Sequence, residues 1–206
     1  MTNYEMWSVV LGIAGVIISA TAFWQIRLLI TQNQKEHEEK RRLHTVELML
    51  EWSKSLKRET SFAETVVEGL NHEQSKCLFE KKTFKVDKKT MQMILEVCPE
   101  WKEEYDFDLH RDSYEVKDMV LAQLRWYVIS YLNMLETIMT AWNIGILDKE
   151  TIVQQYSYLY SEEKGWNVLS AFRMAAGKNA YPNIDAFIEE LKRKGGGESV
   201  SRKRIL

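Results

Sequence analysis

The sequence is poor in the residues that mark disulfide-rich or zinc-binding domains and in those that interrupt helices. Its 206 residues include two cysteines, Cys77 and Cys98, twenty-one positions apart and without a CxxC pair. This spacing fits neither a disulfide scaffold nor a zinc cluster, so we expect reduced, partly buried thiols. The two prolines, Pro99 and Pro182, lie outside the long periodic segments. Long uninterrupted helices are therefore favoured.

Motifs for catalysis, cofactors and metals are also absent: there is no P-loop, GxGxxG, GxSxG or HExxH. The letters "HRD" at 110–112 lack the downstream Asn and DFG that a kinase catalytic loop requires. His37 and His44 share a helical face with nearby glutamates, a pattern that a charged helix presents without any metal. We predict no catalytic, cofactor-binding or metal-binding residues.

Positive charge is not in excess either. Lys and Arg total 28 against 30 Asp and Glu, which gives a net charge of −2. Without a basic field we expect no nucleic-acid partner. The composition, 45% hydrophobic and 11% aromatic, supports one core. One domain plus an N-terminal anchor is the expected organisation.

The anchor is predicted from Met6–Ile26, twenty-one consecutive residues without charge. At about 1.5 Å per residue this length matches a hydrocarbon core of about 30 Å. Trp7 and Trp24 stand near its two ends, and Arg27 follows it, as expected of residues at the membrane interface. A cleaved signal peptide and a buried core helix are the alternatives. The first fits less well because "MTNYE" has no basic residue.

Basic residues set the expected orientation. No Lys or Arg precedes the stretch, whereas five follow it within the next about 15–20 residues, the window over which the positive-inside bias acts: Arg27, Lys35, Lys40, Arg41 and Arg42. The positive-inside rule then predicts a single-pass protein of the inner (plasma) membrane, with the N-terminus outside and the bulk of the chain in the cytoplasm.

Small residues recur inside the predicted span at spacings of 4, 3, 4 and 3: Ser8, Gly12, Gly15, Ser19 and Ala22. Such a stripe lets membrane helices approach closely, which favours a homo-oligomer. The alternative is that glycine and alanine are simply common in membrane helices.

The chain after the anchor is expected to be all-α. We expect a transmembrane anchor at 1–30, a solvated helical stalk at 31–42, a cytoplasmic helical bundle at 43–194 and a flexible basic tail at 195–206. Leu43, Val46, Leu50 and Trp52 are expected to begin the face that packs on other helices.

Within the bundle, "SFAETVVEGL" is expected to be helical, "LFEKKTFKV" locally extended, and Asp87 the N-cap of "KKTMQMILEV". The run 114–147 is expected to hold the central helix, stopped by Asn143 and Gly145. Asp148 should cap the next helix, and further helices are expected at 165–176 and in "AFIEELKRK".

One polar group stands out in the central helix. Asn133 and Glu136 lie one turn apart amid large apolar residues, with Arg125 two turns earlier. A buried carboxylate needs a partner. The favoured interpretation is a structural cluster in which Glu136 pairs with Arg125, Arg42 or a tyrosine hydroxyl; the alternative is a functional site.

The order of the segments resembles an uncharacterised family of single-pass bacterial and prophage-encoded membrane proteins with a helical domain of unknown function. The resemblance is carried by positions in "RRLHTVELMLEW" and "LNMLETIMTAWNIGILDKETI": Arg42, Thr45, Trp52, Asn133, Glu136, Gly145, Leu147 and Asp148. It implies a single-pass topology, an all-helical cytoplasmic domain and a place in a phage-defence or prophage locus.

These observations lead to one favoured function and two alternatives. The favoured one is a non-catalytic, membrane-anchored interaction or sensor protein that self-associates and binds a cytoplasmic protein. The alternatives are an oligomeric membrane-disrupting effector and an enzyme with an unrecognised site around Glu136.

Overall fold

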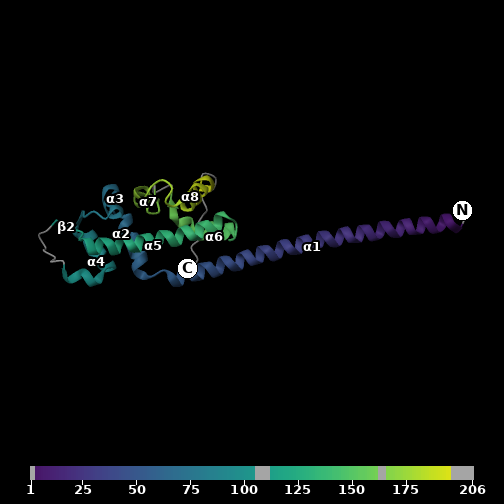
Figure 1. Ribbon diagram of the computed structural model, residues 1–206, viewed down its shortest axis with the longest axis horizontal. Coiled ribbons are helices and arrows are strands. Elements are labelled where there is room, and N and C mark those ends of the chain that lie inside the picture. Colours follow the sequence, from purple (N-terminus) through teal and green to yellow (C-terminus); the bar gives the residue numbers. More distant parts are fainter. Residues whose placement is uncertain (1–2, 105–111, 162–165, 196–206) are drawn as a thin grey trace. The chain divides into compact units, whose positions relative to one another are not determined.

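The computed structural model describes residues 3–104, 112–161 and 166–195, without the side chains of 3–22, 55, 104 and 195. The chain is mostly helical, as the hydrophobic periodicity predicts (Figure 1). Its α-helices are α1 (Asn3–Ser55), α2 (Arg58–Glu68), α3 (His72–Glu80), α4 (Lys88–Val97), α5 (Asp118–Asn143), α6 (Lys149–Tyr156), α7 (Ser170–Ala176) and α8 (Pro182–Gly195).

Short elements connect these helices. Two 3-10 helices, η1 (Pro99–Glu104) and η2 (Ser157–Leu159), follow α4 and α6. The strands are β1 (Lys85–Asp87), β2 (Ser113–Glu115), β3 (Tyr160–Ser161) and β4 (Trp166–Asn167). They form two antiparallel pairs, β1 with β2 and β3 with β4.

The chain divides into two compact units, Met1–His44 and Thr45–Leu206. In unit 1, the backbone is helical from Asn3 onward, and every described side chain is exposed. Among the described residues, no helix combines the length and apolar character needed to cross a membrane. Most of the predicted span 6–26 lies outside the residues whose side chains are described. So does the predicted tail 195–206.

The last turns of α1 correct one sequence-based expectation. The side chains that turn toward unit 2 are Thr45, which is fully buried, and Leu48, Met49 and Trp52, which pack against the core. Leu43, Val46 and Leu50 instead remain 58%, 50% and 54% exposed. The prediction that these three begin the packing face is therefore wrong, although Trp52 does pack inward. The reason is that 45, 48, 49 and 52 follow the same 3.6-residue period on the other side of the helix.

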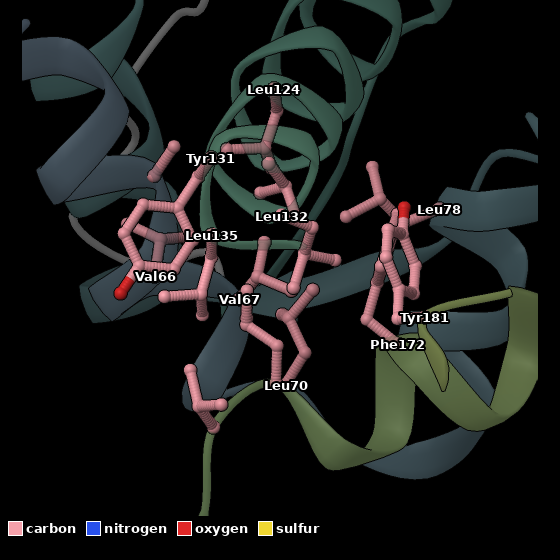
Figure 2. Packing of buried hydrophobic residues seen from close by; sticks show 14 of the residues in the cluster. Val66, Val67, Leu70, Leu78, Leu124, Tyr131, Leu132, Leu135, Phe172 and Tyr181 are labelled. Atoms are coloured by element: carbon pink, nitrogen blue, oxygen red, sulfur yellow. The ribbon is translucent and has the colours of Figure 1, made fainter. Parts of the chain in front are cut away.

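Helix α5 is the centre of unit 2, with α2 and α8 packed along it (Figure 1). Figure 2 shows side chains of α5 meeting those of α2, α3 and α7 in one apolar cluster. Many of these side chains have no exposed surface, including Leu124, Leu132 and Leu135 of α5. Burying a Leu side chain contributes about 1.5–3 kcal/mol, so this cluster fixes the arrangement of the surrounding helices.

Several helix ends follow the predicted signals. Asp87 accepts a hydrogen bond from the Thr90 N–H (2.7 Å) and Asp148 accepts one from the Thr151 N–H (2.9 Å), so both cap helices as expected. Gly145 has φ +79° directly after α5, a conformation that favours glycine. Helix α5 ends at Asn143, as the sequence predicts.

Three local elements differ from the expectation. Helix α3 was missed; Asn71 and Gln74 form a capping box at its start. Helix α5 begins only at Asp118, because Tyr114 is paired with Val86 across β2 and β1. Helix α8 begins already at Pro182, a residue suited to the first helical turn. Each of these depends on a local cap or pairing rather than on apolar periodicity.

Candidate functional site

Glu136 of α5 is bound to the beginning of α8. Its Oε1 accepts hydrogen bonds from the Asn183 backbone N–H (2.9 Å) and side-chain Nδ2 (2.8 Å), and its Oε2 accepts one from the Ile184 N–H (3.0 Å). The first N–H groups of a helix have no partner within that helix, and its N-terminus carries partial positive charge. The Glu136 carboxylate therefore caps α8 from a neighbouring helix.

The neighbours of Glu136 hold this cap in place. Thr140, one turn further along α5, donates to the Glu136 carbonyl (2.7 Å) and accepts from Asn183 Nδ2 (3.0 Å). Beyond it, the rings of Trp142 and Phe187 meet edge to face with centroids 5.0 Å apart. Polar capping and aromatic packing together fix α8 against α5.

Of the residues of the predicted polar cluster, Arg42, Arg125, Asn133 and Glu136, two have hydrogen-bond partners outside it: Glu136 binds the start of α8, and Arg125 binds a carbonyl of α3. Arg125 donates from Nε to the Phe79 carbonyl (2.9 Å), and its guanidinium lies 5.3 Å from the centre of the Phe79 ring. Asn133 is exposed on α5, and Arg42 is exposed in unit 1. The partners of Glu136 are backbone N–H groups. Every residue except proline carries such a group, so the pattern of residue types in the sequence does not indicate which of them will be the partner.

A second carboxylate group was missed. Glu64 and Glu68 lie one turn apart on α2, both half-buried. Glu68 accepts hydrogen bonds from the Leu169 N–H and from the Trp166 indole N–H (3.2 Å). It thereby ties α2 to the segment between β4 and α7. Leu169 has a left-handed backbone, φ +45°, an unusual conformation for a branched apolar residue.

The environment of these two carboxylates favours their protonated forms. Burial raises the pKa of Glu64 to about 7, and the negative charge of Glu68 adds to the increase. Burial also raises the pKa of Glu68, against the opposing effect of its two hydrogen-bond donors. Near neutral pH Glu64 therefore exchanges a proton with solvent.

Two tyrosines complete this group, which we call the acidic-tyrosine cluster: Glu64, Glu68, Tyr131 and Tyr158. Tyr131 of α5 is 4% exposed, and burial raises the pKa of its hydroxyl, with Tyr158 and Glu64 adding to the effect. Figure 2 shows the Tyr131 ring against the α2 side chains, with its hydroxyl directed outward from the core. The sequence signal that was overlooked is a pair of glutamates at i, i+4 beside Val66 and Val67.

Arg173 of α7 is a further buried polar residue that the sequence analysis missed. It is 6% exposed; its Nε donates to the Val168 carbonyl (2.9 Å), and one terminal nitrogen donates to Asn167 Oδ1 (2.5 Å). The other terminal nitrogen is paired with Asp185 of α8. Arg173 thus joins β4, α7 and α8, and this full set of acceptors is what allows its burial.

The described residues contain no group of three or more His, Cys, Asp or Glu placed to hold a metal ion. Cys98 is buried, and burial raises the pKa of its thiol to about 12, so that it remains protonated. Beside Glu68 lies a hollow of about 210 Å³, which Trp166, Asn167 and Ser170 help to line.

The predicted membrane-contacting residues fall mostly in the part of α1 without described side chains. Trp7 and the stripe of Ser8, Gly12, Gly15, Ser19 and Ala22 belong to that part. Trp24 is 65% exposed and Arg27 is also exposed, and the Arg27 carbonyl accepts a hydrogen bond from Thr31 Oγ1 (2.9 Å).

Comparisons with known proteins identify no related protein. No family model, no curated protein and no solved structure matches the chain.

Proposed function

We propose that the chain is a membrane-anchored helical interaction protein that presents unit 2 to a protein partner in the bacterial cytoplasm, within a phage-defence or prophage locus. The anchor is the uncharged stretch Met6–Ile26. The basic residues that follow it direct unit 2 to the cytoplasmic side.

The observation that carries this proposal is the continuity of α1. One helix without a break begins at Asn3, contains the whole uncharged stretch, and ends at Ser55. Its last turns supply Thr45 and Trp52 to unit 2: the Thr45 hydroxyl accepts a hydrogen bond from the Asp148 N–H (2.8 Å), and the Trp52 ring lies 5.8 Å from that of Tyr131. The last turns of α1 are therefore part of the core of unit 2.

The polar chemistry of unit 2 supports a non-catalytic role. Both oxygens of Glu136 accept backbone N–H groups of α8, and both oxygens of Glu68 accept N–H groups from the segment before α7. Carboxylates held in this way fix elements to one another. An interaction domain needs such rigidity to present a defined surface.

The anchor is tested by membrane extraction of the full chain. We expect it in the membrane pellet after alkaline carbonate treatment, and a reporter that works only in the cytoplasm should be active when fused after Leu206. A matched variant, Ile13→Arg with Ile17→Arg, should no longer be found in the membrane pellet. Each charge at the centre of a membrane helix raises the free energy of insertion by about 2.5–3.5 kcal/mol. Wild-type chain in the supernatant would overturn the anchor.

The membrane-disrupting alternative makes a different prediction. Overexpression should then depolarise cells, and exchange of 6–26 for an unrelated span should abolish the effect. We expect no depolarisation with either chain, because a single span without charges makes a poor ion path. Depolarisation that depends on the native span would replace the interaction-protein proposal by the effector.

A further inference from the structure

The end of α1 carries two apolar faces, and unit 2 uses only one of them. Thr45, Leu48, Met49 and Trp52 pack inward. The other face consists of Leu43, Val46 and Leu50, each at least half exposed, and we call it the outer stripe. Its spacing of 3 and 4 residues places the three side chains in one row along the helix.

We propose that the outer stripe binds the same stripe of a second copy of this chain, as a short parallel two-stranded coiled coil. In a heptad repeat, Leu43 and Leu50 take successive a positions and Val46 takes the d position between them. The inward residues 45, 48, 49 and 52 then fall at c, f, g and c. Thr45, Leu48 and Trp52 therefore face away from the seam and keep their contacts with unit 2 when a second helix adds to the stripe, while Met49 at g borders the seam.

The charges beside the stripe determine its direction. Arg42 falls at the g position that precedes Leu43, and Glu47 at the following e position; both side chains are exposed. In a parallel pair, g of one helix meets e of the next heptad on the other helix, so Arg42 lies opposite Glu47 of the second copy. An antiparallel pair centred on Val46 would instead bring the two Glu47 side chains together and place Arg42 opposite Leu50. Charge complementarity thus favours a parallel homodimer.

The size of the stripe limits where it can act. Three apolar side chains per copy are a small seam beside the roughly 800 Å² per partner of a standard interface. Two copies anchored in one membrane have a high effective concentration and already point in the same direction. In this respect the proposal rests on the proposed function, because the anchor supplies the parallel direction and the proximity.

A cysteine crosslink tests the seam in the full chain. Val46→Cys should give an oxidant-dependent dimer in isolated membranes, at least fivefold above the wild type, whose own Cys77 and Cys98 provide the background. Glu51→Cys is the matched control, because position 51 is exposed on the same helix but turned away from the stripe. Equal dimer yields at positions 46 and 51 would overturn the proposal.

A charge exchange tests the direction. In the Val46→Cys background, Arg42→Glu alone and Glu47→Arg alone should each reduce the dimer yield severalfold, and the two together should restore it. Helicity and resistance of unit 2 to trypsin are measured for each variant to show that it is folded. If the double variant crosslinks no better than the single ones, the parallel pairing is wrong.

Failure of the seam and failure of the anchor give different results. The same samples are extracted with carbonate, and the crosslink is scored in whichever fraction holds the chain. A carbonate-resistant chain without a position-46 dimer overturns the seam alone. A dimer formed by chain in the supernatant supports the seam and overturns the anchor.

Discussion

Two half-buried glutamates on neighbouring helices, Glu136 of α5 and Glu64 of α2, differ in what surrounds them. Glu136 meets the first backbone N–H groups of α8, which carry partial positive charge. Glu64 meets a second carboxylate, Glu68, and burial raises its pKa to about 7. Similar burial therefore accompanies a carboxyl group bound by backbone N–H groups in one place and a carboxyl group whose pKa is raised to about 7 in the other.

This difference shows that burial alone does not determine the role of a carboxylate. Desolvation disfavours the charged form of a carboxyl group, hydrogen-bond donors favour it, and a second negative charge nearby disfavours it further. In each site, substitution of one glutamate changes its surroundings without changing the other site. The two sites can therefore be compared in the same molecule.

The largest effect is expected from Glu136→Ala. It leaves the N–H groups of Asn183 and Ile184 without the acceptor, and charge-assisted hydrogen bonds of this kind contribute about 1.5–3 kcal/mol. We expect the free energy of unfolding to fall by about 2–3 kcal/mol in urea titrations of the full chain in mild detergent. Asn133→Ala, three residues away and exposed, is the control and should change it by less than about 0.5 kcal/mol. Equal losses would show that Glu136 does not cap α8.

The second effect is a pH dependence that Glu64 creates. Because its pKa in the folded protein is raised to about 7 from 4.5, the folded state binds more protons than the unfolded state between these values. The stabilisation is complete below about pH 4.5 and is lost as pH rises through 7. Glu64→Gln should therefore unfold less readily than the wild type at pH 8, by about 1–2 kcal/mol after allowance for solvent screening.

Urea unfolding at pH 5.5 and pH 8 measures this effect. The decline in stability between the two pH values should be smaller in Glu64→Gln than in the wild type, and other titrating groups cancel in the comparison. Parallel declines in both proteins would mean that Glu64 has an ordinary pKa.

A smaller effect is expected from Asn183→Ala. This change removes the side-chain bonds from Asn183 Nδ2 to Glu136 and Thr140 but leaves the backbone N–H groups on Glu136. We expect a loss of about 1 kcal/mol in the same urea titrations, since a neutral hydrogen bond contributes about 0.5–1.5 kcal/mol. A loss as large as that of Glu136→Ala would assign the cap to the side chain rather than to the backbone.

The parts of the fold that the sequence predicts are those with a long period or a strong cap. The helical character of the chain, the caps Asp87 and Asp148, and the end of α5 near Gly145 all follow from local rules. Helix α3 was missed because its apolar face is short. The outer stripe of α1 was misassigned because the helix has apolar residues on two sides, and periodicity does not say which side meets the core.

The candidate site was harder to predict than the helices. Glu136 was correctly singled out as a residue in need of a partner, but its partners are backbone N–H groups of a helix 47 and 48 residues later. Glu64 and Glu68 were not singled out in the sequence. Their burial depends on Tyr131 and on the segment around Trp166, which the tertiary fold brings to them from distant parts of the sequence.

The smallest expected effect concerns the interaction of the two carboxylates within the acidic-tyrosine cluster. The charge of Glu68 contributes to the raised pKa of Glu64, but burial contributes more. Removing that charge by Glu68→Gln should therefore lower the pKa of Glu64 by less than about one unit and leave it above the ordinary value. A titration of carboxyl-labelled glutamate by NMR measures both values, and Glu59→Gln, at the start of the same helix, is the control. A Glu64 pKa that returns fully to about 4.5 would show that the neighbouring charge, and not burial, raises the pKa of Glu64.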